Sequence, residues 1–187
     1  MALTSSLIPL GTPAPDFALP DVAGATHRLD SFTAPVLVVA FLCNHCPYVK
    51  HIEQAMGRLT RTSTLDIVAI CSNDAERYPE DAPAQLADQA ERAGWRFPYL
   101  IDDDQRVAKA YGAVCTPDFF VYGPDRRLAY RGAFDESTPG NGLPVTGDAL
   151  AAAIDLIAGG QSVPEPHRAS MGCGIKWLPG NEPNGDR

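Results

Sequence analysis

The sequence predicts an α/β domain in which helices flank a central mixed β-sheet. Short apolar runs typical of buried strands alternate with segments of helical periodicity. Two further apolar segments, 119–122 and 128–131, flank a Gly-Pro-Asp turn and predict an antiparallel hairpin. A chain of 187 residues is long enough for one domain with a single sizeable core.

The first predicted strand and helix stand on either side of a cysteine pair. The apolar run 36–42 is continuous rather than alternating, which indicates a strand covered on both faces. From Pro47 to about Thr62, apolar residues recur at helical spacing. A proline is tolerated in the first turn because the N–H there needs no partner within the helix. The segment 65–71 predicts the next strand.

The second half of the chain continues this alternation. A helix is predicted over 84–93 and ends at a glycine, and a strand follows over 97–101. A short helix reaches Tyr111, and after the hairpin another helix covers 146–158. Strands alternating with helices, followed by an antiparallel pair, predict a mixed sheet.

The chain divides into a domain over 1–160 and a C-terminal tail over 161–187. The tail is polar and rich in proline and glycine, but it carries Met171, Ile175 and Trp177. We expect these apolar side chains to dock the tail on the domain before its last residues become flexible.

Composition and charge narrow the range of possible partners and locations of the protein. The chain is 45% hydrophobic and 20% charged, as in globular domains, and its net charge is −8. An acidic chain is repelled by phosphate groups, so we expect no nucleic-acid or membrane partner. Residues 1–11 lack the basic and apolar parts of a secretory signal, and no apolar run reaches the roughly 18 residues of a membrane span. A cytoplasmic location is expected.

The cysteine pair is the strongest functional signal. Cys43 and Cys46 are spaced C-x-x-C where a strand meets a helix. A helix N-terminus presents free N–H groups and the positive end of the helix dipole, which favour a thiolate. The same spacing also occurs as half of a zinc site or by chance, but its position favours redox chemistry. A third cysteine, Cys71, ends an apolar run and is expected to be a buried strand residue.

A second motif, Thr116-Pro117, lies between a helix and a strand. With the C-x-x-C pair it resembles the thioredoxin superfamily, whose members place a cis-proline opposite the cysteines. The opening 11–21 and the segments FLCNHCPYVKH, CSND, VCTPDFFVY and GCGIKW resemble bacterial thioredoxin-family or peroxiredoxin-like proteins of the redoxin, AhpC/TSA type. The likeness spans residues 11 to 177.

This resemblance implies a thioredoxin-like fold and a thiol–disulfide oxidoreductase or isomerase. Cys43, as the more exposed thiol, is expected to attack, and Cys46 to resolve the mixed disulfide. Pro117 is implied to be the cis-proline, and backbone groups of Thr116 to bind an extended peptide. The expected partners are protein or small-molecule thiols and disulfides. No organic cofactor and no metal are expected.

His45 lies between the two cysteines, where an imidazolium ion would lower a thiol pKa and stabilise the reduced form. Two departures from thioredoxin affect turnover. The buried acid that precedes the first cysteine by six residues is replaced by Leu37, and the usual tryptophan by Leu42. His45 or water would have to carry the proton instead.

Cys115 and Cys173 are possible accessory redox residues. Cys115 is two residues before Pro117, and Cys173 lies in the tail with its apolar anchors. They either form a disulfide that holds the tail over the site, relay electrons to Cys43 and Cys46, or are two separate buried thiols.

Three other functions remain open. A thiol peroxidase would use Cys46, which precedes Pro47 as in peroxiredoxins, although Cys43 and Val39 replace the expected threonine and proline. The peroxiredoxin arginine would fall near Thr116-Pro117, and neither of these residues is a cation. A binding module would use the fold without turnover. A copper carrier would draw its ligands from a larger set of soft side chains. That set comprises Cys43, Cys46, His51, Cys115, His167 and Cys173.

Overall fold

The computed structural model describes residues 2–5, 8–61 and 65–183, and its centre is a five-stranded mixed sheet. The strand order is β6-β5-β4-β8-β9. Strands β4, β5 and β6 run parallel, whereas β8 is antiparallel to both β4 and β9. The predicted mixed sheet and hairpin are therefore confirmed. The strands are β4 (Leu37–Phe41), β5 (Asp66–Cys71), β6 (Tyr99–Ile101), β8 (Asp118–Tyr122) and β9 (Leu128–Gly132).

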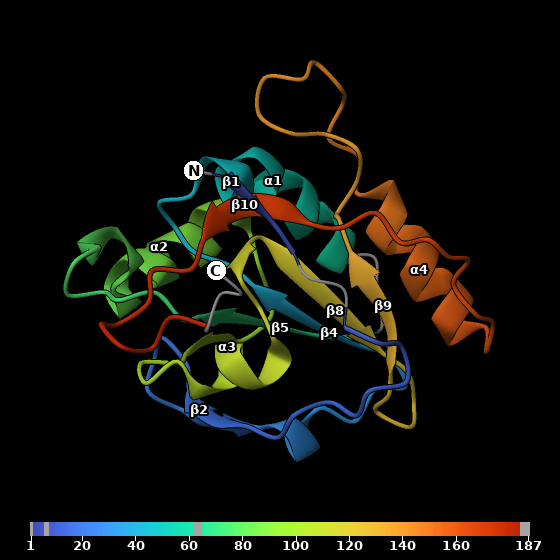
Figure 1. Cartoon of the computed structure of the whole chain (residues 1–187), viewed down its shortest axis with the longest axis horizontal. Coiled ribbons are helices and arrows are strands. Elements are labelled where there is room, and N and C mark those ends of the chain that lie inside the picture. Colours follow the sequence, from blue (N-terminus) through green and yellow to red (C-terminus); the bar gives the residue numbers. More distant parts are fainter. Residues whose placement is uncertain (1, 6–7, 62–64, 184–187) are drawn as a thin grey trace.

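Helices cover both faces of this sheet. Helices α1, α2 and α4 lie on one face and α3 lies on the other (Figure 1). Each face has its own apolar core, so every residue of β4 is buried, as its continuous apolar sequence predicts. The helices are α1 (Pro47–Arg61), α2 (Pro83–Ala93), α3 (Arg106–Tyr111) and α4 (Asp148–Ala158), with short 3-10 helices η1 (Leu29–Ser31) and η2 (Pro79–Asp81).

Two smaller sheets complete the fold. Strands β2 (Ala18–Pro20) and β3 (Thr26–Arg28) form a hairpin, and β2 contacts β6. The other sheet joins distant parts of the chain in the order β1-β10-β7. In it, β10 lies between strands from the N-terminus and from the middle of the chain. These strands are β1 (Ala2–Thr4), β7 (Cys115–Thr116) and β10 (Met171–Gly174).

The residues after α4 contact the domain through only part of the expected set. Ile175 is buried, and Trp177 packs against the core on the α3 side of the sheet. Met171 is 44% exposed, so the expectation that it anchors the tail is wrong. It lies at the rim of a small pocket rather than in a core.

The predicted helix after the cysteines is confirmed, since α1 begins at Pro47. Its predicted end at Thr62 lies outside the described residues, and so do residues 184–187 of the tail, whose last residues are expected to be flexible. Within the described ranges, each helix is too short or too polar to cross a membrane.

Candidate active site

The two cysteines of the C-x-x-C motif lie together at the N-terminus of α1. Strand β4 ends at Phe41, and two residues later the chain reaches Cys43. The carbonyl of Cys46 accepts the N–H of Lys50 at 3.0 Å, which is the first hydrogen bond of α1. Cys46 is therefore the residue that caps this helix, where free N–H groups surround its sulfur.

Thr116 contacts both sulfurs from the opposite side. Its bond to Pro117 is cis, as the family resemblance implied. Cys43 Sγ lies 3.1 Å from Thr116 Oγ1, and Cys46 Sγ lies 3.2 Å from the Thr116 carbonyl oxygen. The structure thus brings together four of the residues that the sequence singled out.

The exposure of the cysteines differs from expectation. Cys43 and Cys46 are both 0% exposed, so the expectation that Cys43 is the more accessible thiol is wrong. Strand β10 pairs with β7 beside them, and Cys173 stands opposite Thr116 in that pairing. Of the cysteines, all of which lie in described segments, only Cys173 retains partial exposure. The site is closed by the C-terminal strand.

The electrostatics favour a thiolate on Cys46. The pKa of Cys46 is lowered to about 5, chiefly by a hydrogen bond from the Cys43 thiol. The Cys173 thiol and the backbone N–H groups of Val49 and Cys173 add further donors, and together they outweigh the burial that opposes the charge. The Thr116 carbonyl also opposes the charge, because it can only accept a hydrogen bond, which Cys46 donates as a protonated thiol.

Cys43 behaves in the opposite way. Burial raises the pKa of the Cys43 thiol well above its usual value, and its hydrogen bond to Cys46 and the charge of Asp81 add to this effect. The surroundings of the pair therefore favour the proton on Cys43 and the negative charge on Cys46.

His45 is directed to a carboxylate. Its Nδ1 donates to Asp81 Oδ2 at 2.6 Å, and its ring stacks on Tyr78 with centroids 5.3 Å apart. The expected effect of its charge on the thiols is thus opposed at short range by a buried anion. His45 still lies close to Cys43, because a ring nitrogen, the Cys43 sulfur and an Asp81 oxygen all lie within 4.8 Å of one another.

Asp81 is the residue that the sequence did not reveal. It ends η2, and its side chain is 0% exposed. Its two oxygens accept from the backbone N–H groups of Asn44 and His45, from the His45 ring and from Asn73 Nδ2. Burial opposes its charge, but these donors hold the pKa of Asp81 below its usual value. A carboxylate therefore does stand near Cys43, although not in the position that Leu37 occupies.

The remaining accessory residues are dispersed. Cys115 is buried, pairs in register with Gly174 rather than with Cys173, and has its thiol 3.8 Å from the Pro117 carbonyl. Cys71 is buried at the end of β5, as expected.

The two histidines considered as ligands for a copper carrier form hydrogen bonds outside the cysteine site. His51 Nε2 lies 3.0 Å from Ser137 Oγ, and His167 Nδ1 accepts from the N–H of Arg131. Cys43, His45 and Asp81 offer three ligand atoms, but both Asp81 oxygens already serve hydrogen bonds within the loop. A metal ion there would have to break those bonds, and the set does not fit a resident metal.

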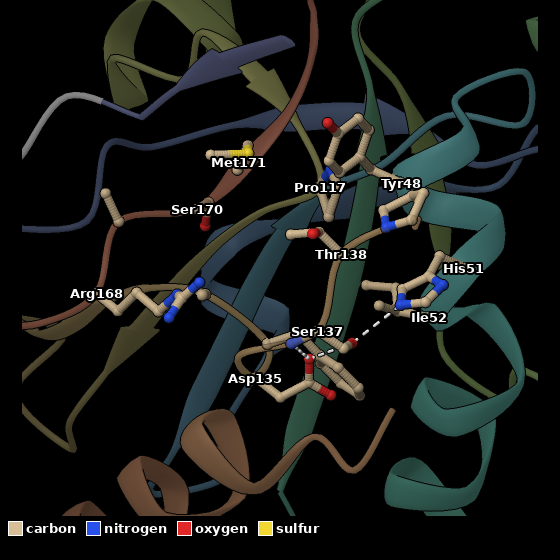
Figure 2. Close-up of a pocket in the computed structure, with 14 residues that line it drawn as sticks. Tyr48, His51, Ile52, Pro117, Asp135, Ser137, Thr138, Arg168, Ser170 and Met171 are labelled. Atoms are coloured by element: carbon tan, nitrogen blue, oxygen red, sulfur yellow. Dashed lines mark hydrogen bonds between the residues drawn. The ribbon is translucent and has the colours of Figure 1, made fainter. Parts of the chain in front are cut away.

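A small pocket adjoins the site beside Pro117. Figure 2 shows it between α1, the start of β10 and the loop that follows β9. Its cavity volume is about 50 Å³, far below that of an ordinary small-molecule site. His51, Ser137 and Asp135 form a hydrogen-bonded row along one wall, with Ser137 Oγ donating to Asp135 at 2.6 Å (Figure 2). The pocket has room for a few water molecules or one small side chain.

The sequence and the fold agree on the family. The sequence model of the AhpC/TSA family matches residues 10–131. Because this match covers more than half of the chain, the protein belongs to the AhpC/TSA family, within the thioredoxin superfamily.

Individual relatives are consistent with this assignment. An uncharacterized conserved protein from Geobacillus kaustophilus is 47% identical, with a TM-score of 0.93 over 96% of this chain and 97% of its own. The thioredoxin domain of a thiol-disulfide oxidoreductase from Bacteroides vulgatus is 14% identical, with a TM-score of 0.59 over 79% of this chain and 99% of its own. The second likeness concerns the fold alone, and the expected thioredoxin-like fold is confirmed.

A curated relative carries a functional name. The thiol-disulfide oxidoreductase ResA of Geobacillus thermodenitrificans is 26% identical over 117 residues, which cover 61% of this chain and 63% of that protein. The chain thus spans somewhat less than two thirds of the length of this relative.

Proposed function

We propose that this protein is a thiol–disulfide oxidoreductase that cycles between two thiols and a disulfide at Cys43 and Cys46. The observation that carries this proposal is the contact of both sulfurs with Thr116 and with each other at the mouth of α1. Two thiols in contact can form and reopen a disulfide without rearrangement of the fold. The name of the relative ResA supports the same reaction.

The charge distribution favours the oxidising direction. A fold that stabilises the thiolate of Cys46 stabilises the reduced form, and such a disulfide is readily transferred to a substrate dithiol. In that reaction the substrate loses two electrons and two protons. Cys43 and Cys46 gain the two electrons, Cys43 takes one proton, and the second proton is released to solvent because Cys46 is left as a thiolate. We assign Cys43 and Cys46 as the catalytic residues and His45, held by Asp81, as a positioning residue. Thr116 and Pro117 form the binding surface.

The test is a redox titration. The purified full chain is equilibrated with glutathione buffers, and the Cys43–Cys46 disulfide is quantified by alkylation and mass spectrometry. We expect one reversible disulfide with a potential above about −270 mV, the value typical of thioredoxin. Oxidation of a model dithiol should be lost in Cys46→Ser. Failure to form this disulfide in any buffer would overturn the proposal.

A thiol peroxidase is the second candidate, favoured by the low pKa of Cys46 at a helix N-terminus, directly before Pro47. A peroxidase needs a cation to stabilise the charge that develops on the peroxide oxygens. Against this function, the buried guanidinium of Arg131 is hydrogen-bonded to Asp118 at 2.9 Å. A peroxidase would oxidise Cys46 to a sulfenic acid, and Cys43→Ser would retain this first step. Rapid peroxide consumption by Cys43→Ser, trapped by a sulfenic-acid probe, would favour the peroxidase over the oxidoreductase.

We further propose that the partners are protein or small-molecule thiols and disulfides in the cytoplasm. The use of cysteine supports this location, because cysteines in a reducing compartment are more often catalytic than structural. The net charge of −8 supports the exclusion of nucleic acid and anionic membranes. Fractionation of cells that express the untagged protein from its own locus tests the compartment.

A further inference from the structure

The C-terminal strand fills the edge of β7 that adjoins the cysteines. Strand β10 runs antiparallel to β7, with Cys173 opposite Thr116 and Gly174 opposite Cys115, and Ile175 continues the ladder by donating to the Val114 carbonyl at 3.0 Å. A free strand edge is a common docking surface for an extended peptide. Here the edge is occupied by the chain itself, and β10 lies between β1 and β7, next to α1 (Figure 1).

The fit of this strand is tight enough to fix its register. A side chain at Gly172 would place its Cβ 1.9 Å from the Thr116 carbonyl oxygen, so only glycine allows this approach. The strand is also held at both ends. Ser170 Oγ donates to the Gly132 carbonyl at 2.6 Å, and the Lys176 N–H donates to Asn73 Oδ1 at 2.8 Å.

This register places a third sulfur at the redox pair. Cys173 stands opposite Thr116, whose Oγ1 lies 3.1 Å from Cys43 Sγ and whose carbonyl oxygen lies 3.2 Å from Cys46 Sγ. The Cys173 side chain also packs against the core cluster that contains both of these cysteines. In agreement with this placement, hydrogen bonds from both Cys43 and Cys173 lower the pKa of Cys46. Cys46 is therefore the middle member of a row of three sulfurs. Cys43 and Cys46 are fully buried, whereas Cys173 is partly exposed. An external thiol or disulfide that approaches the folded protein meets Cys173 first.

We propose that Cys173 is a third redox thiol, which exchanges with the buried disulfide and carries it to the surface. This proposal rests on the proposed Cys43–Cys46 chemistry. Cys173 loses its proton and attacks Cys46 Sγ, the Cys46–Cys173 bond forms, and the Cys43–Cys46 bond breaks. Cys43 leaves as a thiolate and takes up a proton. No electrons are gained or lost overall, so the step needs no external oxidant.

The first test isolates the new disulfide. Trypsin leaves Cys43 and Cys46 in one peptide, 29–50, and Cys173 in another, 169–176. A Cys46–Cys173 bond therefore cross-links two peptides, whereas a Cys43–Cys46 bond does not. The folded Cys43→Ser variant is oxidised with diamide, which accepts the two electrons, and is then mapped without reduction. We expect the cross-link in most molecules.

Matched variants make this result decisive. Cys115→Ser in the same background should leave the cross-link unchanged, because Cys115 lies in peptide 110–126 and pairs with Gly174. Cys46→Ser should abolish it. Absence of the cross-link in oxidised Cys43→Ser, while the wild type forms its Cys43–Cys46 disulfide, overturns the relay alone. Absence of both disulfides overturns the proposed function.

The second test measures whether the Cys43–Cys46 disulfide is reduced by external thiols through Cys173, the route that we call the relay. The oxidised wild type and the oxidised Cys173→Ser variant are mixed with reduced glutathione, and the loss of the Cys43–Cys46 disulfide is followed by acid quenching and mass spectrometry. Because the relay makes one exchange intramolecular, we expect Cys173→Ser to react at least about tenfold more slowly. If β10 only covers the site, the serine variant, which keeps its shape, reacts as fast as the wild type, and the relay is wrong.

Discussion

At the scale of single residues, the negative charge of the reduced site lies on the second cysteine of the motif. Cys46 collects the hydrogen-bond donors, whereas Cys43 is buried beside Asp81 and keeps its proton. The helix N-terminus that the sequence predicts is what permits this arrangement, because the sulfur of the capping residue receives the free N–H of Val49. The charge of the site therefore depends on what surrounds each sulfur and not on the order of the cysteines in the motif.

The contribution of Cys43 to this charge can be measured. Its thiol is the largest single cause of the lowered pKa of Cys46, so Cys43→Ala should raise that pKa from about 5 toward the ordinary value of about 8.5. The ultraviolet absorbance of the thiolate, followed against pH, reports the change. Cys71→Ala is the control, since it removes a buried thiol that does not donate to Cys46. A Cys46 pKa that stays near 5 in Cys43→Ala would contradict this account.

Asp81 gives a second prediction at this scale. Asp81→Asn keeps the shape of the side chain but removes a charge that raises the pKa of Cys43. The new amide group can also place an N–H donor opposite the side chains of Asn73 and His45, which in the wild type donate to a carboxylate oxygen of Asp81. We expect a lower Cys43 pKa, read from its Cβ chemical shift in labelled protein. We also expect a loss of about 1–3 kcal/mol in the free energy of unfolding, typical of an unsatisfied buried group.

The control for Asp81→Asn is Asp88→Asn on the exposed side of α2, which removes one charge from the surface. It should change neither quantity. If both variants lower the Cys43 pKa equally, the effect is one of net charge and the local role of Asp81 is wrong.

The sequence predicts the site residues that belong to short motifs, but it does not predict those that enter the site only through long-range contacts of the fold. Cys43, Cys46 and Thr116 carry their chemistry in short patterns, and the structure places them together. Asp81 stands in the polar run Tyr-Pro-Glu-Asp, which has the composition of a solvent-exposed turn. Its burial depends on donors from two separate loops, and a local pattern does not record such contacts. The exposure of Cys43 was misjudged because the covering strand lies far away along the chain.

At the scale of elements, long segments can be predicted from local sequence, whereas short strands depend on contacts made by the fold. The strands of the five-stranded sheet and the helices are predicted by their periodicity or by their continuous apolar runs. Strands β1, β7 and β10 have two to four residues each, and their composition is not that of a strand. They form because distant segments supply one another with backbone partners. The Gly-Cys-Gly of β10 is typical of a loop in sequence and forms a strand because it pairs with β1 and β7.

Gly172 provides the test of that strand. Replacing glycine by alanine inside a strand ordinarily stabilises it by roughly 0.5–1 kcal/mol. Gly172→Ala should do the reverse, because its Cβ would meet the backbone carbonyl of Thr116 at 1.9 Å. We expect a loss of about 1–3 kcal/mol, the usual cost of overpacking, and faster amide exchange over 171–175.

Gly174→Ala is the matched control for this strand, since the one close contact of its Cβ would be with the end of the Leu3 side chain, at 2.9 Å, which can turn away, and the Val114 carbonyl oxygen lies at 3.8 Å. Equal destabilisation by the two alanines would show that the close approach of β10 to Thr116 does not fix the strand.

At the scale of the whole molecule, the site is closed by segments from both ends of the chain. Residues 2–4 and 171–174 form one sheet with β7 (Figure 1). This sheet is the lid of the site, because Thr116 of β7 contacts both sulfurs. The hydrogen bonds from Cys173 to Cys46 connect this lid to the charge of the reduced pair. The redox state of two sulfurs is thereby linked to the stability of the folded chain.

That linkage predicts that the reduced protein is more stable than the oxidised one. The pKa of Cys46 falls from about 8.5 in the unfolded chain to about 5 in the fold, and the resulting stability is present above the first value and lost as the pH falls through the second. Cys43, with a raised pKa, removes stability only above about pH 8.5. The advantage of the reduced form should thus be largest near pH 8 and smallest below pH 5. Each kcal/mol appears as about 2–4 °C in Tm for a domain of this size. Thermal unfolding of both forms at these two pH values checks the sign, and an oxidised form that melts higher at pH 8 would refute the assignment of the charge to Cys46.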